Sequence, residues 1–533
     1  MNYKALLFLC ITVGIFSCKP KEKTAAVNYD NFLNEYIDST VSPGEDFFKF
    51  AMGKWLKNNP IPESERSWGI WTLVNEENYS RIRKINEEAA ANTKAKKGSN
   101  EQKIGDFWFT GMDTVTIEKQ GITPLKPELD KIAAISDPQG VIKMASYLHT
   151  MQVQPLFGNY IFQDEKNSNK FRLHFYQGGI GLPDRDYYFD KDERTVTIRN
   201  EYVKHISKMF QLTGIDAATA DTYAQTIMKM ETDFAGASRK LADLRDPYAN
   251  YNSMAVADVN KLCPAINWES FLADAGIKNI DTIIVGQPEF FKQLNTSLTK
   301  ESVDNWKIYL QWNLINAYAD RLSSDFDKEH FHFYGTILNG TKEQRARWKR
   351  VLDAEEDAMG FLLGQLYVEA YYPPEEKARY EKIVENTMAA YKVRIQQLDW
   401  MSPETKEKAL LKLSTVIKKV GYPDKWRDYS ALTITRDSYV QNAINANKYL
   451  HAYEVEKLYK PVDKTEWEMT PQTWNAYYNP SNNEIVLPAA AFIVPGVPDK
   501  YVDDAIAYGY AAGSTIGHEI THGFDDQGSQ FDE

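Results

Sequence analysis

Apolar residues in the second half of the chain recur three and four positions apart, which is typical of helices that bury one face. In the segment 380–398 they are Tyr380, Ile383, Val384, Met388, Tyr391, Ile395 and Leu398. Ser402 followed by Pro403 is a typical helix start, with an N-cap and a proline in the first turn. We therefore expect a second helix that runs through Lys412 and stops before Gly421, a good left-handed terminal residue.

Strand patterns are sparser, and two of them lie close together. They cover residues 474–478 and 484–487, and the residues between them are Asn479, Pro480, Ser481, Asn482 and Asn483. This composition is typical of a turn, so the pair predicts a β-hairpin. The chain as a whole predicts a mainly α fold of the α+β class.

The first residues predict an export signal. Lys4 precedes an apolar run over residues 5–16, which is followed by Ser17 and Cys18. The order of charge, apolar run and small residue is that of a secretory signal, and the run is too short to span a bilayer. Residues 15–18 resemble the lipobox of bacterial lipoproteins, in which Cys18 would carry the lipid. An ordinary signal peptide is the alternative. Residues 19–28 then form a tether.

Length and composition bound the remaining possibilities. The chain has 533 residues, 43% of them hydrophobic, which is enough for a large core and two to four domains. A net charge of −12 argues against a sequence-independent nucleic-acid binder, which needs a basic surface. Once Cys10 and Cys18 are cleaved or acylated, Cys263 stands alone, and we expect it to be a small buried residue rather than a nucleophile.

The strongest chemical motif is His518-Glu519-Ile520-Thr521-His522. On a helix, residues four apart lie on one face, so both imidazoles can reach one zinc ion at about 2.0–2.1 Å. Glu519 lies beside that face and can take a proton from a zinc-activated water that attacks a peptide carbonyl. The alternative is a helix with two surface histidines.

A zinc peptidase uses three protein ligands. The metzincin pattern would require glycine and histidine at the positions of Asp525 and Gly528, so that class is excluded. Glu533 follows His522 too closely to return to the same ion. His330 and His332 lie far from the motif, and we expect them to be structural. The prediction is therefore that the third ligand is absent from the chain.

The string Gly-His-Glu-Ile-Thr-His-Gly-Phe-Asp-Asp-Gln-Gly at 517–528 resembles the zinc helix of the neprilysin/endothelin-converting-enzyme family of metallopeptidases, the M13 family. Residues 475–478 and 483–490 resemble the substrate-binding hairpin of that family. Further similar strings follow in the same order, at 43–48, 53–56, 181–188, 347–350, 398–401 and 421–423. Several ordered strings are far more specific than one pentapeptide.

The resemblance implies a two-lobed, neprilysin-like architecture. A mostly helical cap domain would cover 29–430, a connection 431–470, and the start of an incomplete thermolysin-like catalytic lobe 471–533. It implies His518 and His522 as ligands of one zinc ion and Glu519 as general base. Asn475 and Ala476 would pair with the substrate backbone. Asp525 and Asp526 would orient an imidazole from behind, cap the helix or face solvent.

Several features of the family pattern have no counterpart in the sequence. These are a later glutamate ligand on a second helix, and a later histidine and arginine that stabilise the oxyanion and bind substrate. Family members often place an arginine directly before an aromatic-glycine pair. Here Ser67 precedes Trp68 and Gly69, and Arg66 is one position further back. This departure favours an endopeptidase over a carboxydipeptidase.

We thus expect an exported zinc endopeptidase of oligopeptides, lipid-anchored in a bacterial cell envelope, that is inactive without a third zinc ligand. Its partners would be peptide substrates and, through the anchor, a membrane. One alternative is a catalytically dead peptide-binding lipoprotein. Another is a helical glycan-binding lipoprotein, suggested by 12 Trp and 32 Tyr. That class has no use for His518, Glu519 and His522, and the sequence predicts no oligomeric state.

Overall fold

The computed structural model describes residues 36–494 and 496–532, which belong to two compact units divided after Pro62. The predicted signal and lipidation site (1–18, with Cys18), the tether (19–28) and Glu533 lie outside the described residues. The first unit contains helix α1 (Phe47–Asn58), which starts where the Asp46 carboxylate accepts a hydrogen bond from the backbone N–H of Lys49.

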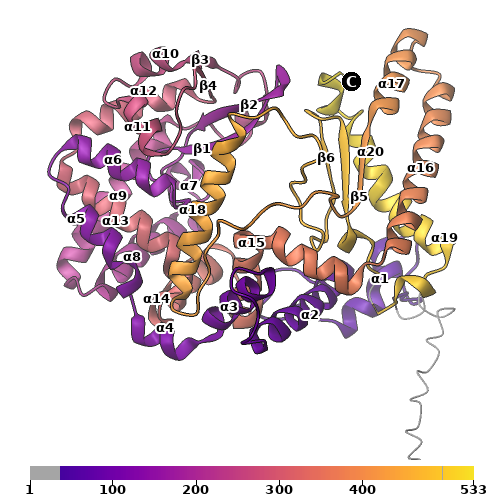
Figure 1. The fold of residues 1–533 in the computed structure, drawn as a ribbon, viewed down its shortest axis with the longest axis horizontal. Helices are drawn as coiled ribbons and strands as arrows, with labels where there is room; N and C mark the ends of the chain where they lie inside the picture. The colour runs from indigo at the N-terminus through magenta and orange to yellow at the C-terminus, as the bar shows by residue number, and fades with distance from the viewer. Residues whose placement is uncertain (1–35, 495, 533) are drawn as a thin grey trace, which may run out of the picture. The chain divides into compact units, whose positions relative to one another are not determined.

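The second unit is mainly helical (Figure 1). Its helices are α2 (Ile70–Ala91), α3 (Asn100–Met112), α4 (Thr114–Gln120), α5 (Lys126–Ala133), α6 (Pro138–His149), α7 (Asp186–Phe189), α8 (Glu193–Leu212), α9 (Ala217–Ala237), α10 (Val256–Leu262), α11 (Trp268–Asp274), α12 (Pro288–Lys300), α13 (Val303–Tyr318), α14 (Ser324–His330), α15 (Arg347–Tyr371), α16 (Pro374–Gln397), α17 (Pro403–Thr415), α18 (Tyr439–Lys457), α19 (Asp504–Ala507) and α20 (Gly517–His522).

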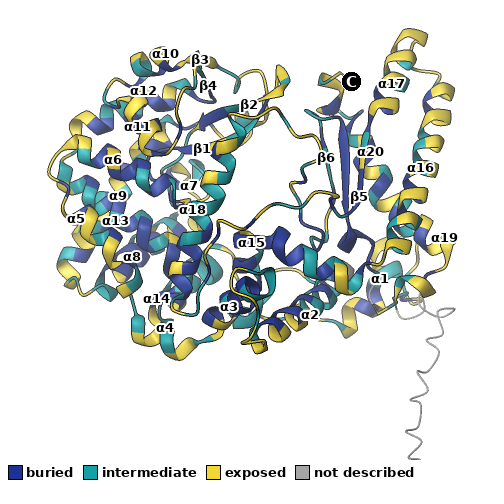
Figure 2. Cartoon of the chain, viewed as in Figure 1, coloured by how far each residue is buried: buried dark blue, intermediate teal, exposed yellow. Residues whose placement is uncertain are grey.

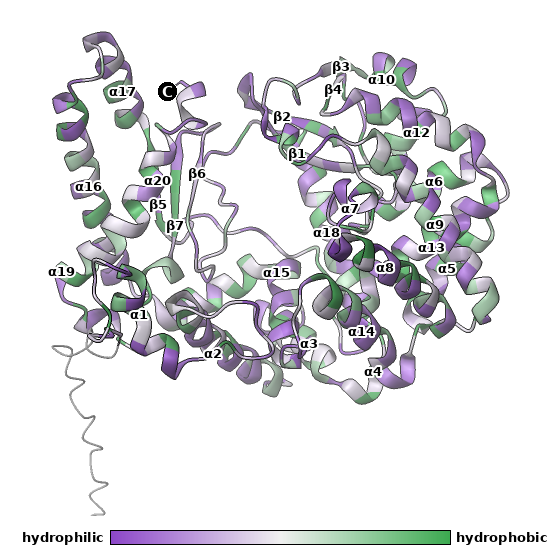
Figure 3. Cartoon of the chain, turned by 180° about the vertical axis from the view of Figure 1, so that it is seen from behind, coloured by the Kyte–Doolittle hydropathy of each residue, from purple (hydrophilic) through white to green (hydrophobic). Residues whose placement is uncertain are grey.

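Two small sheets complete the second unit. The first contains β1 (Gly158–Asp164), β2 (Asn167–Tyr176), β3 (Ser253–Ala255) and β4 (Thr282–Val285), in the order β1-β2-β4-β3. The second contains β5 (Ile417–Gly421), β6 (Tyr477–Asn479) and β7 (Glu484–Pro488), in the order β5-β7-β6. Strand β7 pairs in parallel with β5 and antiparallel with β6, so it is the central strand. Its residues are largely hydrophobic, as the green colour in Figure 3 shows.

The second unit buries two large hydrophobic cores and a small third cluster of Val74, Ala490 and Ile493. Figure 2 shows the buried residues in dark blue. The first core is built from residues 125–333, together with Val440, Ala443, Ile444 and Val455 of α18. The second core is built from residues 82–117, 351–446 and 467–520, and contains the β5-β7-β6 sheet and Ile520 of α20. The prediction of a mainly α fold with minor β structure is therefore confirmed.

The helical predictions hold with one correction. Helix α16 buries Tyr380, Ile383, Val384 and Ile395, as the periodicity predicts. The Ser402 hydroxyl caps α17 by accepting from the N–H of Thr405. The predicted end of α17 was wrong, because the helix stops at Thr415 and residues 417–421 form β5. Gly421 has a positive φ of 80°, but it ends this strand instead of a helix.

The predicted hairpin is present as β6 and β7, and its first strand lies further along the chain than expected. Residues 474–476 are not in the strand, which begins at Tyr477. Pairing of Tyr477 with Val486 and of Asn479 with Glu484 sets the register. Asn483 in the turn adopts a φ of 48°, a left-handed conformation that asparagine tolerates. The physical reason for the shift is that only residues from Tyr477 onwards have a partner on β7.

Three smaller expectations can be compared with the structure. Cys263 is fully buried, and burial raises the pKa of its thiol to about 12, as suits a small core residue. Within the described part of the chain, no helix is long and apolar enough to cross a bilayer. The predicted connection, 431–470, contains α18, whose buried side chains join the first core.

Candidate active site

The motif at residues 518–522 lies at the end of one continuous helical segment, and its helix α20 is called the zinc helix below after the family resemblance. Helix α19 leads into a π-helical stretch, Tyr508–Ile516, and then into α20. Wide π turns are often found beside functional sites. In α20, Glu519 and Ile520 are buried while His518 and Thr521 are exposed. The last turn therefore packs against the second core and still presents the first histidine to solvent.

The two histidines converge. Nε2 of His518 and Nε2 of His522 are 3.0 Å apart, because residues four apart stand one turn above each other. The Nδ1 atom of His522 lies 2.8 Å from Oδ2 of Asp525. An ionised carboxylate only accepts, so Nδ1 carries the proton and the Nε2 of the neutral ring is left with a lone pair. That lone pair is directed at the space shared with His518.

This arrangement suits a zinc ion. Two nitrogens bound to one tetrahedral zinc at 2.0–2.1 Å would be about 3.3 Å apart, close to the separation found. A carboxylate behind a ligating imidazole is a common support for zinc, because it fixes the tautomer and makes the ring a better donor. The donor set of His518 and His522, with Asp525 behind, therefore fits two of the ligands of a zinc site.

The pKa values of Asp525 and Glu519 are shifted in opposite directions. Burial acts to raise the pKa of Asp525, but hydrogen bonds from Gly528, His522 and Gln527 outweigh it and lower the pKa overall. Glu519 is only 6% exposed, and burial raises its pKa against the pull of both histidines. A raised pKa suits a carboxylate that accepts a proton during a reaction.

A tyrosine from α16 holds the first turn of the zinc helix. The Tyr391 hydroxyl lies 2.6 Å from the carbonyl oxygen of Gly517 and 2.6 Å from Oγ1 of Thr521. The Thr521 hydroxyl also bonds to that carbonyl, at 2.8 Å. A single hydroxyl of α16 thus joins both ends of this turn.

The hairpin lies beside the other end of the zinc helix. A Cβ atom added at Gly523 would meet the Tyr478 ring of β6 at 3.2 Å, so glycine permits this close approach. Asn475 is exposed and precedes β6, and its Oδ1 accepts from the N–H of Ala476 at 2.9 Å. Ala476 is buried. Strand β6 is an edge of its sheet, with its outer backbone groups unpaired by β7.

The sequence matches the description of peptidase family M13 over residues 43–423 and again over residues 475–533. The chain belongs to peptidase family M13.

Relatives in this family cover almost all of the chain. It is 30% identical over 525 residues to Neprilysin-3 of Drosophila melanogaster. The matched region covers 93% of this chain and 66% of the relative. It is 29% identical over 528 residues to endothelin-converting enzyme 1 of Mus musculus, with 96% and 68% covered. The chain thus spans about two thirds of the length of the curated M13 relatives that it matches.

Solved structures agree with the family assignment. The zinc metalloprotease Zmp1 of Mycobacterium tuberculosis, in complex with an inhibitor, superposes with a TM-score of 0.88 at 36% identity, covering 94% of this chain and 75% of that one. PepO from Lactobacillus rhamnosis has the same fold, with a TM-score of 0.84 at 21% identity over 92% of this chain and 78% of that one.

The structure separates the two aspartates that follow the motif. Asp525 contacts His522, whereas Asp526 is exposed and accepts from the side chain of Gln527 at 3.0 Å. The chain turns sharply here, so neighbouring side chains point in different directions. Of the alternatives for Asp526, the geometry favours the solvent-facing one.

Within residues 36–494 and 496–532 of this M13 chain, no group of three His, Cys, Asp or Glu side chains could hold a metal ion. His518 and His522 have no third ligand there. The His330 ring lies near those of Tyr334 and His205, tilted against the first and edge-on to the second, at ring-centroid distances of 4.7 and 6.5 Å.

Sequence reasoning missed two side chains that support the site, Tyr391 and Lys412. Tyr391 appeared only as one of the apolar positions of α16. Lys412 lies three residues after Ala409 and next to Leu413. A lysine on the apolar side of a helix was the available signal, because such a position buries the amine and requires a partner.

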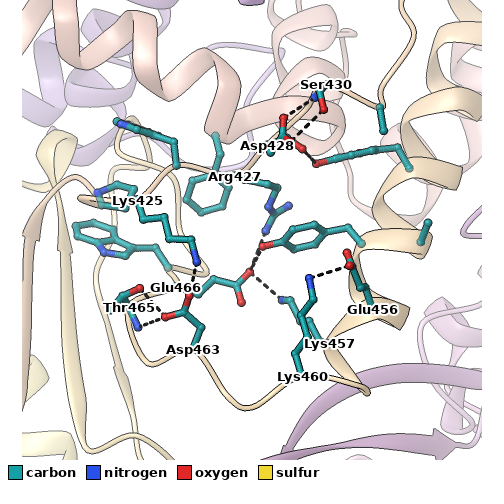
Figure 4. Close-up of a pocket in the computed structure, with 18 of the residues that line it drawn as sticks. Lys425, Arg427, Asp428, Ser430, Glu456, Lys457, Lys460, Asp463, Thr465 and Glu466 are labelled. Atoms are coloured by element: carbon teal, nitrogen blue, oxygen red, sulfur yellow. Dashed lines mark hydrogen bonds and ion pairs between the residues drawn. The ribbon is translucent and has the colours of Figure 1, made fainter.

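A separate cavity of about 550 Å³ lies between α15, α18 and the segments 423–431 and 460–467 (Figure 4). Trp426, Tyr449 and Tyr453 line it. Its lysines are paired: Lys425 with Asp463 at 2.9 Å, Lys457 with Glu466 at 3.0 Å and Lys460 with Glu456 at 2.8 Å. The walls therefore offer aromatic faces and neutralised charges, and none of the motif residues at 518–525 lines them.

Proposed function

We propose that this protein is a zinc-dependent endopeptidase that hydrolyses oligopeptides. The observation that carries the proposal is the convergence of the Nε2 atoms of His518 and His522 at 3.0 Å, with Asp525 on the far side of the second ring. Membership of a peptidase family supports it, as does the likeness to Zmp1, a zinc metalloprotease by name.

Each side chain would have a distinct part in the reaction. His518 and His522 would hold the zinc, and Asp525 would keep His522 in the tautomer that ligates. When bound, zinc supplies Lewis-acid chemistry that polarises a carbonyl and makes water easier to deprotonate. The Glu519 carboxylate would accept the proton of that water and pass it on to the leaving amine. Its burial prepares it for this role by raising its pKa.

The substrate would bind as an added strand. An extended peptide pairs with a sheet edge through main-chain hydrogen bonds, and β6 is the free edge nearest the zinc helix. Asn475 and Ala476 lead directly into that edge. We propose that they extend the pairing beyond Tyr477, with the exposed Asn475 amide offering both a donor and an acceptor.

The experiment is hydrolysis of an internally quenched oligopeptide by the full-length gene product. Glu519→Gln should lower kcat/KM by at least about 100-fold, because it removes the general base. Zinc content should stay unchanged in that variant and fall in His518→Ala. A chelator should abolish activity, and added zinc should restore it. Peptide binding without hydrolysis, unaffected by Glu519→Gln, would instead support the peptide-binding lipoprotein.

The described residues offer two protein ligands to zinc, whereas peptidase sites use three. We therefore expect the 533-residue chain to bind zinc weakly and to turn over little substrate. A zinc titration tests this directly, and tight one-to-one binding accompanied by peptide hydrolysis would contradict it.

We also propose export and lipid anchoring through Cys18, which rest on the sequence of residues 1–18 alone. Endothelin-converting enzyme 1, which the chain resembles, is named for the conversion of endothelin, and an exported enzyme would meet peptides outside the cytoplasm. Cys18→Ser should move the protein from the membrane fraction to the soluble fraction. An unchanged distribution between the membrane and soluble fractions would contradict the lipidation proposal.

A further inference from the structure

Lys412 lies in the last turn of α17 and is only 6% exposed. Its Nζ atom donates to the carbonyl oxygens of Gly528 and Phe531, both at 2.7 Å. A buried ammonium group is costly unless it is hydrogen-bonded, so these two bonds explain how the lysine is tolerated. The side chain thereby ties α17 to the loop that follows the zinc helix.

That loop carries the carboxylate that contacts His522. The N–H of Gly528 donates to Oδ1 of Asp525 at 2.8 Å, while Oδ2 of Asp525 contacts Nδ1 of His522 at 2.8 Å. Gly528 thus links the two side chains, because its carbonyl accepts from Lys412 and its amide donates to Asp525. A continuous path of three hydrogen bonds connects the amine of Lys412 to the imidazole.

The loop also packs directly onto the helix end. A Cβ atom at Gly528 would fall 1.9 Å from the carbonyl oxygen of His522, so no other residue fits without moving the loop. Nothing in this packing by itself sets the direction of the Asp525 carboxylate. The backbone N–H groups of Gly528 and Gln527 do, because both donate to Oδ1 of Asp525, at 2.8 and 2.9 Å, and Lys412 holds the peptide group that follows Gly528.

Lys412 is held from the hairpin side as well. The Asn483 side chain donates to the carbonyl oxygen of Lys412 at 2.9 Å and accepts from the Tyr478 hydroxyl at 2.8 Å. One residue of α17 therefore contacts both the turn of the hairpin and the loop after the zinc helix. These are the two elements that the proposed function assigns to substrate and to metal.

We propose that Lys412 is a positioning residue of the zinc site, which fixes Asp525 against His522 and so sets the tautomer and direction of this imidazole. The metal-binding part of this inference rests on the proposed function. The tautomer part does not, because the contacts among Lys412, Gly528, Asp525 and His522 exist in the chain itself.

The chain offers a matched control in Lys419 of β5. It is equally buried, at 6% exposure, and lies in the same core. Its Nζ atom lies 2.7 Å from Oε2 of Glu484 and 2.6 Å from the carbonyl oxygen of Glu466. Among the described residues, those contacts do not involve the loop after α20. Loss of a buried lysine in general and loss of this particular connection can thus be told apart.

The first measurement is the zinc dissociation constant of the 533-residue chain, by competition with a chromophoric chelator. Substituting residues behind a metal ligand typically weakens binding about 10- to 100-fold. Lys412 acts on Asp525 through Gly528, two residues further from the ligand, so Lys412→Met should weaken zinc binding about fivefold, below that range. Lys419→Met should leave the zinc affinity unchanged while lowering the melting temperature.

The second measurement is the tautomer of His522 at pH 8 in protein labelled with ¹⁵N-histidine, assigned with His522→Ala. The unsubstituted chain should show mainly the Nδ1–H form, and Lys412→Met should show a mixture, with His518 unchanged. A lysine that merely stabilises α17 would not alter this signature. If the unsubstituted chain binds too little zinc to measure, the tautomer spectrum still decides the role of Lys412, and the proposed function is judged separately by the hydrolysis experiment.

A double-mutant cycle with Asp525→Asn completes the test. If Lys412 acts through Asp525, Lys412→Met should change zinc affinity less in the Asp525→Asn background than in the unsubstituted chain. Should Lys412→Met fail to fold, Lys412→Gln replaces it in the same measurements of zinc affinity. Glutamine keeps a polar group in the buried site but is too short to reach the loop. Equal zinc affinity and an unaltered tautomer in a folded Lys412 variant would overturn the proposal.

Discussion

The two cores of residues 63–532 are built in different ways. The first core comes from one nearly continuous stretch, 125–333, completed by four side chains of α18. The second core joins three stretches, 82–117, 351–446 and 467–520, that are far apart in sequence. The helix of the candidate site is anchored in the second core by Ile516 and Ile520, and Tyr391, Tyr478 and Phe524 pack against the same core. Chemistry is thus placed where distant segments meet, because the convergence brings together groups that no single element could supply.

The buried polar groups of the two cores also differ in where their partners lie. In the first core, Glu231 is enclosed and accepts from the hydroxyls of Tyr188 at 2.6 Å and Tyr202 at 3.0 Å. In the second core, Lys419 and Lys412 cross between elements, one within the sheet and one to the loop after the zinc helix. The buried carboxylate of the first core is therefore held within one stretch of the chain, whereas the two buried lysines of the second connect separate elements.

The largest expected effect comes from the centre of the first core. Phe157 is fully buried, and its ring lies 4.8 Å from that of Phe175 and 5.5 Å from that of Trp268. Phe157→Ala should lower the free energy of unfolding by about 4 kcal/mol, through lost burial and the cavity left behind. Hydrogen exchange followed by mass spectrometry should show protection lost across 125–333 before 467–520.

The control is Val393→Ala on the exposed side of α16, where the side chain is 49% accessible. It should change stability by less than about 0.5 kcal/mol. Equal loss of protection in both cores of Phe157→Ala would show that they unfold as one unit, and the comparison above would have to be abandoned.

A somewhat smaller effect should come from the sheet of the second core. Lys419→Met leaves Glu484, which is 1% exposed, without its ion-pair partner. Removing one member of a buried pair costs about 3 kcal/mol, because the remaining charge must be neutralised or hydrated. Urea unfolding gives the size of the loss. Hydrogen exchange should place it in β5 and β7.

Adding Glu484→Leu to Lys419→Met should recover most of that stability, since an apolar pair of similar volume often replaces a buried ion pair at no cost. If the double variant is less stable than the single one, the charge of Lys419 is not what holds β5 to β7. The first core should keep its protection in both variants.

The smallest expected effect is a pH dependence confined to the first core. Burial raises the pKa of Glu231 to about 7, from an ordinary value of 4.5. Between these values the folded chain keeps a proton that the unfolded chain releases, so stability falls as pH rises. From pH 5 to pH 7 the loss due to this residue should be about 2 kcal/mol.

Buried histidines of the same core act in the opposite direction, because burial lowers the pKa of His149 to about 3 and that of His174 to about 4. The measurement is therefore the difference in unfolding free energy between the unsubstituted chain and Glu231→Gln. This difference should shrink by that amount from pH 5 to pH 7. A difference independent of pH would mean that Glu231 is ionised in the folded chain throughout.

Much of the local structure could be read from particular residues. The apolar spacing of Tyr380, Ile383 and Val384 gave the buried face of α16, and Ser402 with Pro403 gave the start of α17. The spacing of His518 and His522 was sufficient to foresee that their rings share a face, because the helical repeat fixes that relation. Local geometry needs only neighbouring residues, so local sequence decides it.

The end of α17 and the start of β6 could not be read in this way. Residues 417–421 became a strand because Glu484–Pro488 lies alongside them, and the strand at 477–479 starts where β7 offers partners. The partners of β5 lie more than sixty residues away, and local propensity does not show such pairing. The partners of β6 are near in sequence, but the register of the hairpin decides which of its residues are paired. The different contacts of Asp525 and Asp526 could not be predicted from the sequence either, because the turn of the backbone directs one to His522 and the other to solvent.

By itself, the sequence determined the helical content, the hairpin, the paired histidines at 518 and 522 and the family to which the chain belongs, since these depend on spacing along the chain. Only the tertiary structure decided which side chains surround that motif. Tyr391 and Lys412 reach the zinc helix from α16 and α17, more than a hundred residues away in sequence. The physical reason is that a buried hydroxyl or ammonium group must find its partner wherever folding brings one, and that place is set by the packing of the whole core.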